Sequence, residues 1–123
     1  MPLKLGQWRM NDNGFETTLS IQSVDGGAVT GSLGIAGAGN LFKISGIWDE
    51  TSQKLVFAVE AEAPAIEPAI YQGFLFSTPG TGQPGADIVW TLTGYQEVVN
   101  IKKLQGNTRR NRFGWYAQIT EVV

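Results

Sequence analysis

The feature that most constrains this chain is the regular return of turn-forming residues between short alternating segments. Clusters rich in Gly, Asn, Asp, Pro and Ser recur roughly every 10 to 15 positions, as in "NDNG" at 11–14 and "DGG" at 25–27. Between the clusters apolar and polar residues alternate, and no helical stripe of useful length occurs. This spacing is typical of an antiparallel barrel or sandwich.

Eight segments fit this description as strands, at about 3–10, 15–24, 28–36, 41–48, 54–63, 69–76, 86–95 and 112–123. The stretch 96–111, "QEVVNIKKLQGNTRRN", is ambiguous, because it either extends the seventh strand into a loop or makes one helical turn. Eight sequential strands with short connections predict an all-β, eight-stranded antiparallel up-and-down barrel, whose closure removes exposed edge strands. A two-sheet sandwich is the alternative fold.

The size and composition of the chain fit a single domain. It has 123 residues, of which 42% are hydrophobic and 16% charged, and it contains no internal repeat and no linker. We therefore expect one barrel domain over residues 1–123. The interior of an eight-stranded barrel has room for side chains or for one small ligand.

The residue types that are missing exclude whole classes of chemistry. The sequence has no cysteine and no histidine, so disulfides, zinc–thiolate sites, Ser-His-Asp triads and Cys-His pairs cannot be built. We expect no catalytic residues, no metal site and no cofactor. No run approaches the roughly 18 apolar residues of a membrane span, and no signal-peptide core is present. The expectation is a soluble protein, either cytoplasmic or a mature secreted form.

Several short motifs resemble, in their order along the chain, the avidin and streptavidin family. They are "GQWRMNDNG", "GAVTGSLG", "ISGIWD", "IYQGFLF", "VWTLTG" and "FGWYAQITEV". The resemblance covers nearly the whole chain and implies the same barrel. It also implies a non-enzymatic protein that binds a small ligand in the lumen, and a homodimer or homotetramer.

The resemblance implies ligand-binding roles for four residues. Asn11 falls on the family's first-strand asparagine if one residue is inserted after Trp8, and it would be a polar contact. Tyr71 and Trp90 match aromatic wall positions. Trp115 matches the tryptophan that reaches into a neighbouring subunit.

The polar positions of the family's biotin site are mostly replaced. Apolar residues stand at these places, namely Phe15, Leu33, Ile35, a position near Ala61, one near Ala69 and one at about Val123. A buried ureido group that loses its partners costs roughly 1–3 kcal/mol per unpaired group. Biotin is therefore a possible but disfavoured ligand, and tight biotin binding is not expected.

The candidate residues also have simpler interpretations. Tryptophans bury a large area, so Trp8, Trp48, Trp90 and Trp115 can pack the core and the barrel ends instead of walling a ligand. Asn and Asp side chains bond their own backbone, so the polar run at 11–13 can simply form a turn. A structural or interaction barrel with a filled lumen and no ligand is therefore the alternative function.

Five of the nine basic residues fall within residues 102–112, namely Lys102, Lys103, Arg109, Arg110 and Arg112. Such a loop can bind a polyanion in a salt-dependent manner. A solvated loop is the simpler interpretation. The net charge of −2 and the lack of any accompanying motif argue against nucleic acid as a partner.

Overall fold

The computed structural model describes residues 1–35, 41–60, 69–79, 87–102 and 107–121, with the backbone alone at 35, 78–79, 98–102 and 107–111. The elements are eight strands: β1 (Gly6–Asp12), β2 (Phe15–Asp25), β3 (Ala28–Ile35), β4 (Leu41–Asp49), β5 (Lys54–Val59), β6 (Ala69–Pro79), β7 (Ile88–Lys102) and β8 (Asn107–Glu121). Within these residues no helix has the length and apolar character needed to cross a membrane.

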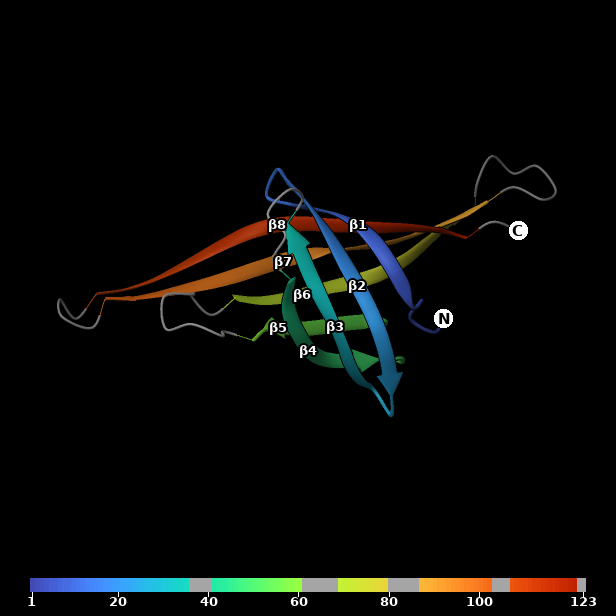
Figure 1. The fold of residues 1–123 in the computed structure, drawn as a ribbon, viewed down its shortest axis with the longest axis horizontal. Helices are drawn as coiled ribbons and strands as arrows, with labels where there is room; N and C mark the ends of the chain where they lie inside the picture. Colours follow the sequence, from blue (N-terminus) through green and yellow to red (C-terminus); the bar gives the residue numbers. More distant parts are fainter. Residues whose placement is uncertain (36–40, 61–68, 80–86, 103–106, 122–123) are drawn as a thin grey trace.

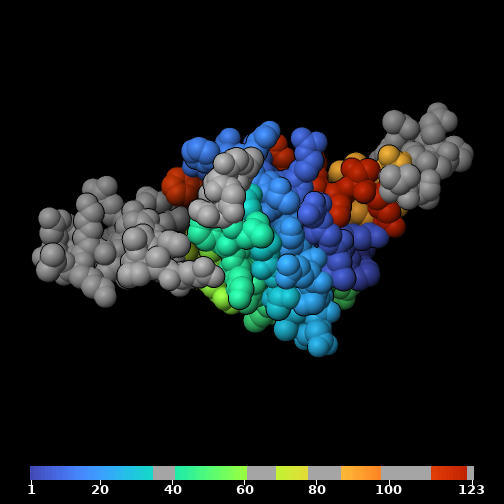
Figure 2. All heavy atoms as spheres, in the orientation of Figure 1, coloured from blue at the N-terminus to red at the C-terminus, as the bar shows by residue number. Residues whose placement is uncertain are grey.

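The strands close into one barrel in sequence order (Figure 1). Each strand pairs antiparallel with the next, and β1 pairs antiparallel with β8 to complete the ring. This confirms the predicted eight-stranded antiparallel up-and-down barrel and removes the sandwich alternative. In the space-filling view, β1 and β2 in blue and β3 in cyan form one continuous surface (Figure 2).

The first hairpin turns on two residues only. Asn13 and Gly14 have φ angles of 50° and 92°, as a tight hairpin turn requires, and Asp12 pairs with Phe15 on either side. Asn11 and Asp12 therefore belong to β1, where the sequence had suggested a four-residue turn. Because side chains alternate along a strand, Asp12 shares the inward face of Trp8 and Met10.

Within the ambiguous stretch 96–111, the extension of the seventh strand is confirmed, and residues 96–102 pair with the eighth strand instead of passing directly into a loop. β7 continues to Lys102 and β8 begins at Asn107, and their ladder runs from Ile88↔Glu121 to Lys102↔Asn107. β6 pairs with β7 only as far as Val98. The β7–β8 hairpin consequently extends past the rest of the barrel, as the orange and red ribbons of Figure 1 show.

The inward side chains form one apolar core along the axis of the barrel. Every strand contributes to it, from Trp8 on β1 to Trp115 on β8. The largest side chains that are fully buried are Trp8, Phe57, Leu19, Ile21, Leu55, Leu92 and Val29. Burial of this set removes apolar surface from water at roughly 25 cal/mol per Å², which is the main stabilising term of the fold.

A glycine on β6 makes room for the ring of Trp115. Gly73 on β6 pairs with Gly94 on β7, and Gly94 pairs in turn with Trp115 on β8. A Cβ atom at Gly73 would lie 2.6 Å from the Trp115 ring. The indole therefore lies directly against the backbone of β6, which only glycine permits.

Replacing Gly94 by alanine should destabilise the barrel strongly. Its Cβ would collide with the carbonyl oxygen of Gln72 and lie 2.6 Å from the Cα atom of Gly73, both of which are backbone atoms that cannot give way cheaply. We expect Gly94→Ala to lower the free energy of unfolding by about 2–3 kcal/mol in urea titrations. Gly114→Ala is the matched control, since no atom lies within 4 Å of its added Cβ. Equal loss in both variants would contradict this account.

Candidate functional site

The candidate site lies inside the barrel at the end where β1 stops at Asp12 and β6 begins at Ala69, which we call the Asp12 end. Three buried aromatic residues fill the lumen there, and we call them the ring cluster. Phe57 and Tyr71 are stacked with centroids 4.7 Å apart. Trp115 meets each of them edge-on at 5.9 Å. Both arrangements are favourable aromatic geometries.

A carboxylate lies beside this ring cluster. The Tyr71 hydroxyl donates a 2.6 Å hydrogen bond to Oδ2 of Asp12. Burial raises the pKa of Asp12 above its usual 3.8, and the bond from Tyr71 offsets only part of that effect. Burial, together with the neighbouring Asp12 carboxylate, raises the pKa of Tyr71 well above 10, so its phenol stays protonated and donates.

Two further polar atoms at this end have no hydrogen-bond partner among the described residues. They are the indole nitrogen Nε1 of Trp115 and the hydroxyl oxygen of Thr17. Thr17 pairs with Met10 on β1, and Trp115 pairs with Asp12 on the same strand, so both atoms belong to the Asp12 end. A buried polar group without a partner costs about 1–3 kcal/mol, and natural proteins rarely retain one without a reason.

Trp115 differs in this respect from the other three tryptophans. Trp8 donates to the carbonyl oxygen of Lys4 at 3.1 Å. Trp48 and Trp90 donate to the carboxylates of Glu50 and Glu121 at 2.7 and 3.0 Å. Each of these indoles is therefore satisfied within the barrel, whereas Trp115 presents a buried donor that nothing in the described chain accepts.

The structure brings together only part of the predicted ligand-binding set. Tyr71 and Trp115 are neighbours in the ring cluster. Trp90 pairs with Ser77, six residues along β6 from Tyr71, which places it about 20 Å away toward the other end of the barrel. Asn11 lies on the outward face of β1, and its side-chain oxygen accepts the amide of Gly14.

The predicted basic loop is described only in part. Lys102, Arg109 and Arg110 lie on the extended β7–β8 hairpin, where only their backbone is described, and Lys103 falls outside the described residues. Arg112 bonds Glu97 at 2.7 Å and lies over the Tyr95 ring. Its charge is thus balanced locally, and this arrangement adds no support for polyanion binding.

The sequence does not identify Thr17 and Phe57 as members of this site. The polar run 11–13 has two interpretations in the sequence, a ligand contact or a turn, and the structure puts Asp12 on the inward face of β1 and leaves the turn to Asn13 and Gly14. The contact of Phe57 with Tyr71 depends on the register between β5 and β6. Sequence alternation alone does not give that register.

Comparison with known proteins bears on the fold. The chain is similar to the crystal structure of Xenavidin, with a TM-score of 0.61 and 17% sequence identity over 94% of this chain and 96% of that one. Comparisons of the sequence with protein-family models and with curated proteins find no match. The barrel therefore has an avidin-like fold, as the motifs of the sequence indicated.

The raised pKa of Asp12 predicts a pH dependence of stability. A carboxyl whose pKa is raised by folding contributes stability that is fully present below 3.8 and is lost as the pH rises through its folded pKa. Asp12→Asn keeps an acceptor for Tyr71 and removes the charge. We expect the free energy of unfolding of Asp12→Asn, relative to wild type, to increase in urea titrations as the pH rises from 3.8 through the folded pKa of Asp12.

Two other carboxylates, Glu50 and Glu121, change the free energy of unfolding with pH in the opposite direction, and both are present in wild type and in Asp12→Asn. The amino terminus beside Glu50 and Lys4 beside Glu121 lower the pKa values of those groups, so their contributions fall as the pH drops. They cancel in the difference between variant and wild type. A difference that stays constant or shrinks with rising pH would show that burial does not disfavour the ionised form of Asp12.

Proposed function

We propose that this avidin-like barrel is a non-enzymatic binding protein that takes a small ligand at the Asp12 end of its lumen. The observation that supports this proposal is the pair of buried polar atoms without partners, Trp115 Nε1 and Thr17 Oγ1. They lie beside a half-buried carboxylate in an otherwise apolar interior. A ligand that supplies their partners would remove a cost that the free protein carries.

The chemistry of these groups sets the kind of ligand. An indole N–H requires an acceptor, and a hydroxyl serves either role. An amide-like or ureido-like group, which carries both a donor and a carbonyl oxygen, fits this set. Biotin stays a disfavoured member of that class, because Leu33 replaces a polar lining residue and is buried in the core.

The ring cluster supports a second candidate function. Phe57, Tyr71 and Trp115 are at most 4% exposed and fill the lumen at the Asp12 end with their own side chains. A barrel plugged in this way can act as a purely structural or interaction module. Under the first proposal, a ligand reaches the polar atoms at the mouth or displaces a ring; under the second, nothing enters.

The outer surface supports self-association of the chain. Exposed aliphatic and aromatic side chains gather on the outward faces of β4 and β6, namely Ile47, Ile70, Phe74 and Phe76. β5 lies between these two strands. Large exposed apolar side chains that lie on one face of a sheet are typical of protein–protein contacts. We propose that a second copy of the chain covers this face, in a homodimer or homotetramer.

The unpartnered hydroxyl of Thr17 gives a direct test of the ligand proposal. Thr17→Val keeps the shape of the side chain and removes a buried polar group, so it should raise the free energy of unfolding of the free protein by about 1 kcal/mol. Thr17→Ser, which keeps the hydroxyl, is the control and should not stabilise. Destabilisation by valine would mean that the hydroxyl already has a partner.

The same substitutions separate the two candidate functions in a binding measurement. Native mass spectrometry of the purified wild type, with and without added biotin, reads bound mass and subunit number together. A co-purified or biotin mass that is lost in Thr17→Val and Trp115→Phe supports the ligand-binding barrel. No bound mass in any preparation, with stable variants, supports the filled barrel.

A negative charge placed on the apolar face of β4 and β6 tests self-association. Phe74→Asp should lower the native mass toward that of one chain, because a carboxylate on a buried interface lacks a partner. Phe15→Asp is the matched control, since Phe15 is exposed in the β1–β2 hairpin away from β4 and β6. A wild type that is already monomeric at micromolar concentration would overturn this part of the proposal.

A further inference from the structure

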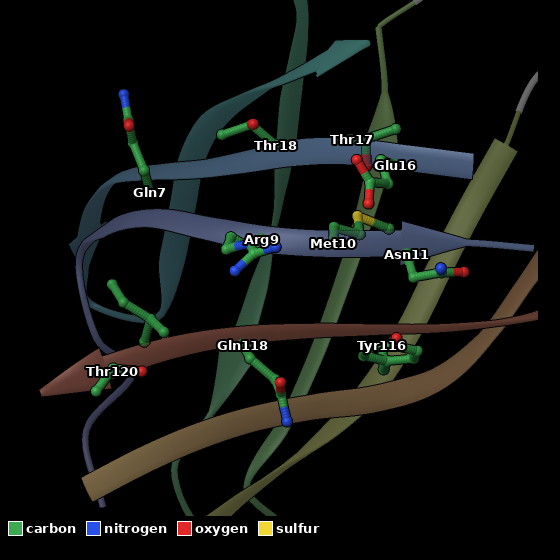
Figure 3. A pocket seen from close by; sticks show the side chains of 11 residues that line it. Gln7, Arg9, Met10, Asn11, Glu16, Thr17, Thr18, Tyr116, Gln118 and Thr120 are labelled. Carbon is green, nitrogen blue, oxygen red and sulfur yellow. The ribbon is translucent and has the colours of Figure 1, made fainter. Parts of the chain in front are cut away.

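A polar groove lies along β1 on the outside of the barrel, away from the apolar face of β4 and β6, and its lining also includes Met10 and Thr17 from the inward face of β1 and β2. It has a volume of about 590 Å³ and crosses β2, β1 and β8. Figure 3 shows its side chains, with Arg9 and Asn11 on the middle strand between Thr18 on one side and Gln118 on the other. This volume is in the range of sites that hold small organic ligands.

The groove lies where β1 and β8 pair to close the barrel. The ladder between β1 and β8 covers only Arg9↔Gln118 to Asp12↔Trp115, whereas β1 begins at Gly6 and β8 continues to Glu121. The ladder has no pair beyond Arg9 toward Gly6, and the side chain of Ile119 lies beside Gly6. The hollow is therefore built into the way the barrel closes and does not depend on a surface loop.

Register arranges the outward side chains of the groove in two rows across three strands. One row is Glu16, Asn11 and Tyr116, and the next is Thr18, Arg9 and Gln118. Neighbouring strands are about 4.8 Å apart, and rows two residues apart are separated by about 6.8 Å. The result is a regular grid of polar groups on a rigid sheet.

The side chains of this grid are rich in both donors and acceptors. Carboxamides come from Gln7, Asn11 and Gln118, and hydroxyls come from Thr18 and Tyr116. Gln118 uses its amide nitrogen on Thr91 at 3.2 Å, and Asn11 uses its oxygen on Gly14, so each keeps its other polar atom for a ligand. Within the described residues, Gln7 and Thr18 make no side-chain hydrogen bond to the protein.

The charges of the groove balance. Arg9 supplies one positive charge and Glu16 one negative charge, and they lie in adjacent rows. Among the described residues neither belongs to an ion pair, so both have donors or acceptors to offer. A balanced pair gives no field that would select a polyanion or a polycation.

Tyr116 adds a flat aromatic surface to this polar grid. It is 48% exposed and lies opposite Asn11 in the β1–β8 ladder. An aromatic ring with a polar tip gives apolar contact area and a hydrogen bond together. A sugar ring is complementary to this combination, because it has an apolar face and a rim of hydroxyls.

We propose that the β1–β2–β8 groove binds a neutral oligosaccharide. Tyr116 stacks on one sugar ring, and the carboxamides and hydroxyls of the two rows bond the hydroxyl groups of that ring and its neighbour. The exposed face of strands in a small barrel is a known location for binding oligosaccharides in other folds. Thr17 belongs to the lining of this groove and to the proposed ligand site in the lumen, so the test of the groove uses Tyr116, an outward residue that takes no part in the lumen site.

The test is a titration of the isotope-labelled full chain, followed by amide chemical shifts, with maltohexaose, cellohexaose and chitohexaose. We expect saturable shifts at outward residues of β1, β2 and β8 with at least one of these probes below about 10 mM. Tyr116→Ala should weaken that binding by about tenfold or more. Tyr95→Ala is the matched control, because Tyr95 is similarly exposed on β7 and lies outside the groove.

Salt and native mass complete the test. Binding of a neutral sugar should be unchanged between about 0.1 M and about 1 M salt, whereas contacts with an anionic ligand would be screened. The proposal is overturned if none of the three sugars gives saturable shifts, or if Tyr95→Ala weakens binding as much as Tyr116→Ala. A fall in native mass caused by Tyr116→Ala would also overturn it, since the groove would then be a contact between copies.

Discussion

The contact between the Trp115 indole and the backbone at Gly73 sets the packing at the Asp12 end of this barrel. The lumen of an eight-stranded barrel is narrow, and a side chain at position 73 would take the space that the indole occupies. Without such a side chain, Trp115 contacts Phe57 and Tyr71 and completes the ring cluster. The ring cluster then buries Tyr71, whose hydroxyl holds Asp12 in place.

The same packing explains why the polar atoms at the Asp12 end are costly to the free protein. A carboxylate, an indole N–H and a hydroxyl are held beside three aromatic rings, where water is displaced and the local dielectric constant is low. Proteins often give up stability at the sites where they act. In this barrel the opposite end shows the contrast, since Trp48 and Trp90 both have carboxylate partners there.

Much of the fold follows from local features of the sequence, and much of the site does not. Alternation and turn residues predicted the strands correctly, because each hairpin is a local unit. Tyr71 and Trp90 both match aromatic wall positions in the sequence, but the structure places them far apart along the barrel, because the register between β6 and β7 depends on partners rather than on alternation. The inward position of Asp12 could not be predicted, because the Asn residues beside it, like Asp itself, are common turn formers. The pairing of the extended parts of β7 and β8 could not be predicted either, because a charged sequence is as typical of a loop as of a two-stranded ribbon.

The short ladder between β1 and β8 also has a consequence for how the chain folds. The other seven ladders join strands that follow one another in sequence, so each can form as a hairpin with a small loss of chain entropy. The ladder from Arg9↔Gln118 to Asp12↔Trp115 joins residues more than 100 positions apart and spans only those four pairs. Because the entropy of closing such a long loop is lost before any contact forms, this ladder is expected to form last and to open first. The barrel is thus a series of hairpins that is closed by one long-range ladder, which forms late.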